Sequence, residues 1–388
     1  MKSERHKKKI FWILAYIILF AAFEGVSFLL VLIFDLQRYD ESLLEPPYNT
    51  FHPYLGWEAR PSYKQGESVT IMTDENAHSI TPLTFENPDI NIVITGGSTM
   101  FGVGSSSNEM TVPSSLERII YERMNIKAEV VNLSVRGYQS FQEMLSLHRF
   151  LKSNKADIVL SVSGVNDAQH AFYYSSDIRS ASLPLEVYKS VALIHKAEQG
   201  ETIIRVHPGR SKLRLLNSFN LLYHIAKKTA SLYSNIAGVK EPGQRKVITS
   251  LPDNISERVK VTITNYAMMN VNAREYGAKF VMFLQPTLFT KRNPKEKEVR
   301  LGKRMEKNYY IRKEYGNLYY KAFRSNLKNF TYYDLSKVLD SDNESETYVD
   351  IAHYNDFGCY KLAEAIYLHI KPLIEAKMNG GLEKELIW

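Results

Sequence analysis

The stretch Asn91–Gly104, NIVITGGSTMFGVG, begins as a short apolar run and stops at two glycines, which a serine and a threonine follow. A short apolar run that ends at glycine is typical of a buried strand. We therefore predict a strand over Asn91–Thr95 that presents Ser98 at its carboxyl end. The pattern leaves open whether this serine has a structural or a chemical role.

The same alternation of short apolar strands and helices continues along the chain. Further strands are predicted at Glu129–Leu133, Asp157–Val162, Lys279–Leu284 and Phe330–Leu335, and helices at Thr111–Met124, Phe141–Lys152 and Asp356–Ala376. We expect Thr111 and Asp356 to be N-caps. Continuous apolar strands between helices indicate a parallel sheet covered on both faces, so the predicted fold class is α/β. Such sheets bind ligands at the carboxyl ends of their strands, near a switch in strand order.

The N-terminus has the features of a membrane anchor. Ile10–Phe34 contains one charged residue, Glu24, and as a helix it would span about 37 Å, enough to cross a bilayer. The apolar part of a cleaved signal peptide is shorter, about 7–15 residues. Residues 1–9 carry five basic side chains and one acidic one, which favours a cytoplasmic N-terminus and an extracytoplasmic remainder. Because a charge within the span is costly, Glu24 is expected either to pair with a partner or to lie in a helix interface.

The rest of the chain is divided by composition. Residues 35–88, rich in proline, tyrosine and polar side chains, are predicted to be a juxtamembrane region with little regular structure. Residues 89–378 form the predicted catalytic domain. Within it, 169–259 interrupts the alternation of strands and helices, and we interpret it as an insertion or lid beside the site. Nothing in the pattern indicates an oligomeric state.

Charge and cysteine content exclude some classes of protein. The 388 residues carry a net charge of +7, of which the N-terminal tail supplies more than half. No stripe of lysine and arginine with interleaved aromatic residues follows, so nucleic acid is not a predicted partner. Cys359 is the single cysteine; it allows no intrachain disulfide and no cysteine-based metal cluster, and we expect a small buried side chain.

Five residues could together perform acyl-transfer chemistry: Ser98, Gly137, Asn166, Asp350 and His353. A serine becomes a nucleophile beside a base, which the histidine can supply while the aspartate holds its tautomer. The backbone N–H groups of the serine and the glycine, with the asparagine amide, can stabilise a tetrahedral oxyanion. The structural alternatives are a turn or N-cap serine, a turn asparagine, a loop glycine and a capping Asp/His pair.

In this order the motifs resemble those of the SGNH (GDSL-type) hydrolases. GGSTMFGVG is similar to the first block in a GGS variant, in which Gly97 replaces the usual aspartate; GYQS resembles the second block loosely, GVND the third closely, and DIAH the final DxxH block. FLQP, Phe283–Pro286, resembles a segment of membrane-anchored members. The resemblance covers about residues 91–378. It implies a three-layer α/β/α sandwich of the flavodoxin-like type, ester chemistry at the five residues and no cofactor.

The predicted function is a membrane-anchored, extracytoplasmic serine esterase that works through an acyl-serine intermediate. The predicted partners are the membrane, through Ile10–Phe34, and an ester-bearing substrate, with a cell-envelope or exported glycan suggested by the location. Three alternatives remain: an O-acyltransferase with the same triad; a lipase or thioesterase, with SFNLLYHIA as a lid helix; and a non-catalytic glycan-binding module that has kept the fold.

Overall fold

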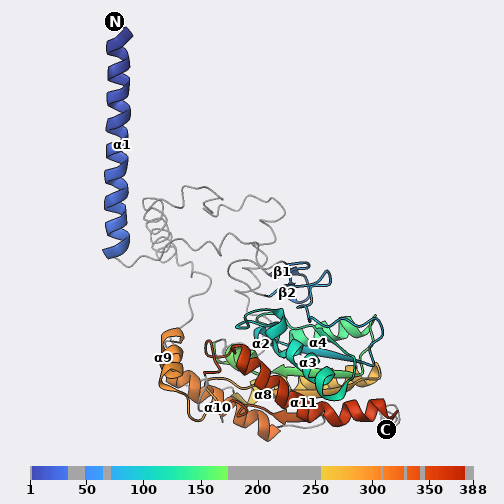
Figure 1. Ribbon diagram of the computed structural model, residues 1–388. Coiled ribbons are helices and arrows are strands. Elements are labelled where there is room, and N and C mark those ends of the chain that lie inside the picture. The colour runs from blue at the N-terminus through green and yellow to red at the C-terminus, as the bar shows by residue number, and fades with distance from the viewer. Residues whose placement is uncertain are drawn as a thin grey trace. The chain divides into compact units, whose positions relative to one another are not determined.

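The computed structural model describes residues 2–33, 49–63, 71–173, 255–306, 309–326, 330–340 and 346–380. The chain divides into two compact units, and of the described residues 2–33 belong to one while the others belong to the second. Most of the predicted insertion, including the candidate lid helix, and the approach over 35–48 lie outside the described residues. Figure 1 labels the elements in chain order.

The first unit contributes one long helix, α1 (Lys2–Ile33). Its segment Phe11–Leu30 has a mean hydropathy of 2.3 and is almost entirely exposed. By length and composition this helix could cross a membrane, and it overlaps the span predicted over Ile10–Phe34. The side of the membrane on which the second unit lies stays a prediction.

The second unit is built on a five-stranded sheet in which all neighbouring strands are parallel. Its strands are β3 (Ile90–Gly96), β4 (Ala128–Asn132), β5 (Ile158–Ser163), β6 (Lys279–Leu284) and β7 (Thr331–Asp334), in the spatial order β4-β3-β5-β6-β7. This is the flavodoxin-like order, with its switch point at the carboxyl end of β3. The predicted α/β class is confirmed, and the strand that carries the opening motif lies at the switch point.

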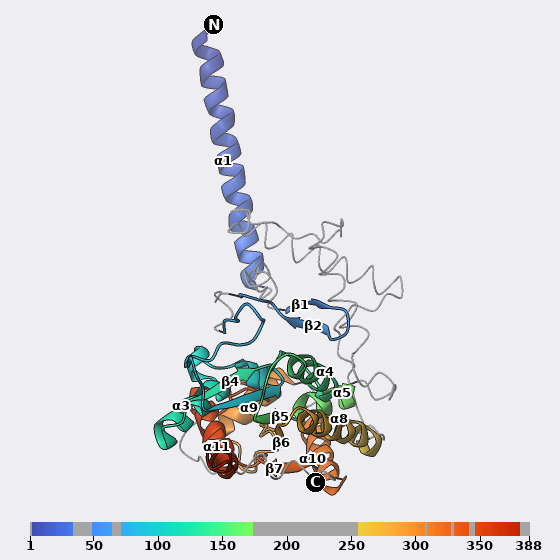
Figure 2. The same cartoon turned by 90° about the vertical axis from the view of Figure 1, so that its right-hand side faces the viewer.

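Helices cover both faces of this sheet. One face is covered by α3 (Val112–Met124) and α11 (Asp356–Met378), and the other by α4 (Ser140–Leu151), α5 (Val165–Tyr173), α8 (Ile255–Glu275) and α10 (Tyr309–Asn326). Figure 2 shows the two helical layers on either side of the strands. The remaining helices are α2 (Ser98–Phe101), the 3-10 helix η2 (Asn108–Met110) and α9 (Glu296–Met305). The arrangement is a three-layer α/β/α sandwich.

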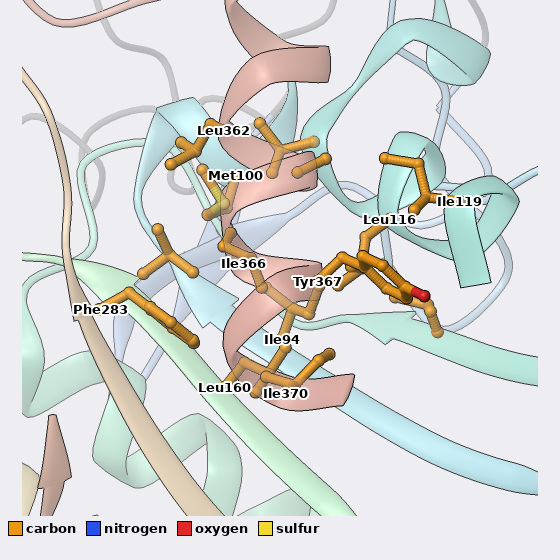
Figure 3. Close-up of a cluster of buried hydrophobic side chains, with 14 of the residues drawn as sticks. Ile94, Met100, Leu116, Ile119, Leu160, Phe283, Leu362, Ile366, Tyr367 and Ile370 are labelled. Carbon is orange, nitrogen blue, oxygen red and sulfur yellow. The ribbon is translucent and has the colours of Figure 1, made fainter. Parts of the chain in front are cut away.

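Alternate residues of the buried strands supply the two cores. Ile94, Leu160 and Phe283 pack with α3 and α11, as Figure 3 shows. Val93 and Val159, one position away along their strands, pack into the opposite cluster. Since successive side chains of a strand point to opposite faces, a strand covered on both sides must be apolar throughout. This explains the unbroken apolar runs in the sequence.

Helix caps agree with the predictions at one helix and differ at another. Thr111 caps α3, because its side chain accepts a hydrogen bond from the Ser114 N–H. At α11 the N-cap is Asn355, whose side chain accepts from the Gly358 N–H. The predicted cap, Asp356, instead accepts hydrogen bonds from the N–H and hydroxyl of Ser106. It therefore joins the start of α11 to the loop after α2.

The region before the sheet has more structure than its composition indicated. Asn49–His52 (β1) and Gly56–Ala59 (β2) form an antiparallel hairpin. With neighbouring residues it builds a third apolar cluster: Leu55, Trp57, Ala59, Tyr63, Ile71, Phe101, Val135 and Tyr138. Its members at 101, 135 and 138 come from α2, which follows β3, and from the loop that follows β4. The hairpin belongs to the same compact unit as the sheet.

Candidate active site

The two glycines of the opening motif allow close packing around Ser98, which is the first residue of α2. A Cβ at Gly96 would lie 2.9 Å from the Val162 carbonyl of the neighbouring strand. A Cβ at Gly97 would collide with the side-chain amide of Asn166. The φ of Gly97 is −93°, which any residue adopts. This glycine is therefore explained by lack of space and not by an unusual backbone conformation.

Asp350 and His353 share one short loop ahead of α11. The Val349 N–H donates to the His353 carbonyl and the Asn355 N–H to the Thr347 carbonyl, which closes the loop with an antiparallel bridge. Within it, one oxygen of the Asp350 carboxylate accepts from the Ala352 and His353 N–H groups, at 2.8 and 2.7 Å. Its other oxygen faces the imidazole. The three-residue spacing thus holds the carboxylate against its own loop.

The structure brings the serine, histidine and aspartate into one line of hydrogen bonds. His353 Nε2 lies 2.7 Å from Ser98 Oγ, and His353 Nδ1 lies 2.5 Å from Asp350 Oδ2. An ionised carboxylate only accepts, so Nδ1 carries the proton and Nε2 is free to accept from the serine hydroxyl. The serine and histidine are 255 positions apart. These distances fit a nucleophile, a base and a residue that orients the base.

Electrostatics favour the ionised form of Asp350. Burial opposes ionisation, but the hydrogen bond and charge of His353, with the two backbone N–H donors, outweigh it and lower the pKa of Asp350. The Asp350 and His353 side chains each retain 19% of their surface exposed. The aspartate is therefore an anion at neutral pH, beside an imidazole that keeps some contact with solvent.

Gly137 lies in the loop after β4, and Asn166 lies in the first turn of α5, directly after β5. Gly137 is exposed, with a φ of +82° that favours glycine. Asn166 is half-buried on α5, and its amide nitrogen donates to the Tyr138 carbonyl at 2.7 Å. An amide has two N–H donors, so one remains for a substrate oxygen. Among the described residues, the N–H groups of Ser98 and Gly137 donate no hydrogen bond.

A buried aspartate joins the two loops that carry these donors. Asp167 accepts from the Ser140 hydroxyl at 2.6 Å and from the Ser140 N–H at 3.1 Å. Ser140 begins α4, three residues after Gly137, and Asp167 follows Asn166. The quoted motifs GYQS and GVND contain both residues, but the sequence alone assigned them no role. The pairing shows that these motifs are in contact through their final residues.

A second buried carboxylate lies beneath the site, between the sheet and α4. Glu143 accepts hydrogen bonds from three strand hydroxyls, those of Thr95, Ser161 and Ser163, at 3.1, 2.8 and 2.6 Å. Burial raises the pKa of Glu143 to about 7, and the charge of Asp167 acts in the same direction. The hydroxyl donors oppose this rise and keep the group satisfied. Its proton is therefore bound more tightly in the folded than in the unfolded chain.

Glu143→Gln is expected to remove a pH-dependent part of the stability. Between pH 4.5 and 7 the unfolded chain loses this proton first, so the wild type loses roughly 3 kcal/mol of stability as pH rises through that window. Thermal unfolding of the full chain in detergent, at pH 5 and pH 8, measures this. When the pH is changed from 5 to 8, the unfolding midpoint of the variant should rise by several degrees relative to that of the wild type. If the difference between the two midpoints is the same at both pH values, the raised pKa of Glu143 is contradicted.

The FLQP segment supports the loop that carries the histidine. Tyr354, directly after His353, donates its hydroxyl to the Pro286 carbonyl at 2.6 Å. The Leu288 N–H donates to the Ile351 carbonyl at 3.1 Å. Because this segment spans the end of β6 (Lys279–Leu284), it connects the sheet to the loop. Cys359, by contrast, is buried with its pKa raised by burial to about 12, in agreement with the expected small apolar side chain.

Comparison with known proteins gives structural similarities only. No family model and no curated protein matches the sequence. Among solved structures the chain is similar to TesA, at 14% identity, covering 73% of this chain and 99% of that one, with a TM-score of 0.37. It is also similar to the acetyl xylan esterase AlAXEase, at 14% identity, 72% and 100% coverage and a TM-score of 0.38.

A third similar structure is a GDSL-like lipase from Bacteroides ovatus, at 14% identity, covering 75% of this chain and 55% of that one, with a TM-score of 0.36. All three TM-scores are below 0.5. At these identities and scores, the chemistry has to be inferred from the side chains of the site itself.

Proposed function

We propose that this protein is a serine esterase that cleaves carboxylic esters through an acyl-Ser98 intermediate. The single observation that carries the proposal is the line Ser98–His353–Asp350, with hydrogen-bond distances of 2.7 and 2.5 Å. Residues far apart in sequence meet there in the order that nucleophilic catalysis requires. The three groups also face solvent enough to receive a substrate.

Acylation follows from this geometry. His353 Nε2 removes the proton of Ser98 Oγ as the oxygen attacks the carbonyl carbon of the ester. The carbonyl electrons move onto oxygen, where the N–H groups of Ser98 and Gly137 and the free N–H of Asn166 would donate to the oxyanion. Collapse breaks the bond to the alcohol, which leaves with the proton from His353. Asp350 stabilises the imidazolium between these two transfers.

Deacylation repeats the sequence with water. His353 takes a proton from the water as its oxygen attacks the acyl carbon, and the same donors stabilise the second oxyanion. Collapse releases the carboxylic acid and returns the proton to Ser98 Oγ. A sugar hydroxyl in place of water would give an O-acyltransferase by identical steps, so the acceptor alone separates these two activities.

The proposed location is the outer side of a membrane, with α1 as the anchor. The support is the apolar segment Phe11–Leu30 together with the basic residues that precede it. An anchored esterase outside the cytoplasm has extracellular or envelope polymers within reach. We therefore propose an acylated glycan as the substrate class, an inference from location rather than from the site.

The decisive experiment is labelling of the full chain in detergent with a fluorophosphonate probe, which reacts with activated serines. The expected result is one adduct, on the peptide that contains Ser98, found by mass spectrometry. Matched p-nitrophenyl acetate and long-chain esters then distinguish an esterase from a lipase, and added sugar acceptors reveal transfer. An unlabelled, inactive protein that is folded would favour the non-catalytic binding module and reject the proposal.

A further inference from the structure

The N-terminal hairpin contacts the loop that presents Gly137. We propose that Trp57 is a positioning residue, which orients the Gly137 N–H toward the oxyanion. The inference rests on the proposed function, because only an acyl-transfer reaction gives this N–H a role. Neither the motifs nor the composition of the region assigned a role to Trp57.

The peptide unit between Arg136 and Gly137 is the centre of the contact. The Trp57 Nε1–H donates to the Arg136 carbonyl at 2.9 Å. That carbonyl and the Gly137 N–H belong to the same peptide plane, and in a trans peptide they point in opposite directions. A hydrogen bond that holds the carbonyl therefore also sets the direction of the N–H. Without it, the plane can rotate about the flexible glycine.

The indole ring also limits where the glycine can move. Trp57 Cζ2 lies 3.2 Å from the position of a Cβ built on Gly137, so the ring lies against the backbone. The Tyr138 hydroxyl donates back to the Trp57 carbonyl at 2.9 Å. Residues 136 to 138 are thus held by the tryptophan through its N–H, its ring and its own carbonyl.

The tryptophan is itself held in place. It is 4% exposed, and its ring lies 6.2 Å from that of Tyr138 within the apolar cluster. The Tyr138 carbonyl accepts from the Asn166 amide. Through Tyr138, Trp57 is therefore linked to both proposed oxyanion donors outside α2, the Gly137 N–H and the Asn166 amide. An oxyanion hole stabilises the transition state only when its donors are oriented beforehand, so a rigid support for both should raise kcat.

A purely structural role is the alternative, since a buried tryptophan with a satisfied N–H is common in cores. The two roles differ in what they change. A structural residue alters the unfolding midpoint and leaves the folded enzyme's kcat alone. A positioning residue alters kcat with little change in KM, because the oxyanion forms only after the substrate has bound.

Trp57→Phe tests the inference in the full chain, in detergent. It keeps an aromatic ring and removes the N–H. We expect kcat for p-nitrophenyl acetate to fall about ten- to a hundredfold, since a misplacement of about 1 Å at the reacting centre can cost about 10²-fold, with KM nearly unchanged. The rate of fluorophosphonate labelling should fall in parallel. Incorporation of 3-benzothienylalanine at position 57, which replaces only the N–H by sulphur, should give the same loss.

Leu55→Ala is the matched control, from the same hairpin and the same cluster. Leu55 is 1% exposed, so this variant should lower the unfolding midpoint more than Trp57→Phe while kcat stays within about twofold. An unchanged kcat in the benzothienylalanine protein, or a loss of kcat that follows the loss of stability in both variants, overturns the inference. A wild type without activity or labelling would instead show that the proposed function is wrong, and the inference with it.

Discussion

Ser98→Ala is expected to reduce kcat for short p-nitrophenyl esters by roughly 10⁴- to 10⁶-fold, the scale of losing one member of a catalytic triad. The variant lacks the oxygen that attacks the ester, while His353 and Asp350 remain hydrogen-bonded to each other. Ser98 is half-buried at the start of α2, and its hydroxyl bonds to the imidazole. The unfolding midpoint should therefore change little. Steady-state kinetics and thermal unfolding of the full chain measure the two effects.

Ser106→Ala is the matched control for the nucleophile. Ser106 lies in the loop after α2 and donates its hydroxyl to Asp356 at 2.6 Å. Removing this exposed hydrogen bond should leave ester turnover nearly unchanged. Hydrolysis that persists in Ser98→Ala at the wild-type rate would mean that another group attacks the ester, and the proposed mechanism would be wrong.

Asn166→Ala is expected to lower kcat by about 10²- to 10³-fold with little change in KM, as removal of one oxyanion donor does. The donor acts on the tetrahedral intermediate, in which the oxygen carries more charge than in the bound ester. The substitution also removes the hydrogen bond to the Tyr138 carbonyl, which should cost about 1 kcal/mol of stability. Kinetics in the same assay, with the unfolding midpoint measured alongside, separate the two losses.

Asn317→Ala provides the control for this second variant. Asn317 is on α10, and its amide donates to the Phe289 carbonyl at 3.2 Å. The same amide also donates to the Lys313 carbonyl at 2.9 Å. The variant therefore loses two side-chain hydrogen bonds away from the proposed oxyanion donors, and kcat should be unchanged. An effect of Asn166→Ala on KM alone would remove that residue from the oxyanion role and leave it as a binding contact.

The helices and strands that could be predicted are those that are specified by residues within or next to the element itself. The helix that begins after Thr111 has its cap and its apolar spacing in the sequence, and the structure has it at Val112–Met124. The strand of the opening motif was predicted one residue short at each end. Buried strands of a parallel sheet are recognisable because both faces are covered and every position is apolar.

The hairpin over residues 49–59 could not be predicted in this way. Its strands have four residues each, too few to establish a period of two. The proline, tyrosine and polar composition of residues 35–88 predicted little regular structure instead. The hairpin is stabilised by packing against Phe101, Val135 and Tyr138, which lie far along the chain. The sequence of the hairpin gives no indication of such distant packing partners.

The residues of the candidate site also fall into two groups, those that could be predicted from the sequence and those that could not. Ser98, Gly137, Asn166, Asp350 and His353 were named from motif order and from the chemistry of their side chains, and the structure places them at the carboxyl ends of strands and in one loop. Their catalytic roles stay predictions until they are measured. The supporting residues, such as Asp167, were present in the motifs, but nothing local showed what they would contact.

By itself, the sequence determined the chemistry available to this protein and the class of its fold. Hydroxyl, imidazole, carboxylate and amide groups follow apolar strands, and the apolar runs require a sheet covered on both faces. The meeting of Ser98 with His353 was predicted from motif order, and the structure supplies its geometry. Only the tertiary structure decided the supporting contacts: Asn166 with the Tyr138 carbonyl, and Trp57 with the peptide before Gly137. The physical reason is that these contacts depend on strand order and register, and uniformly apolar strands carry no local information that specifies either.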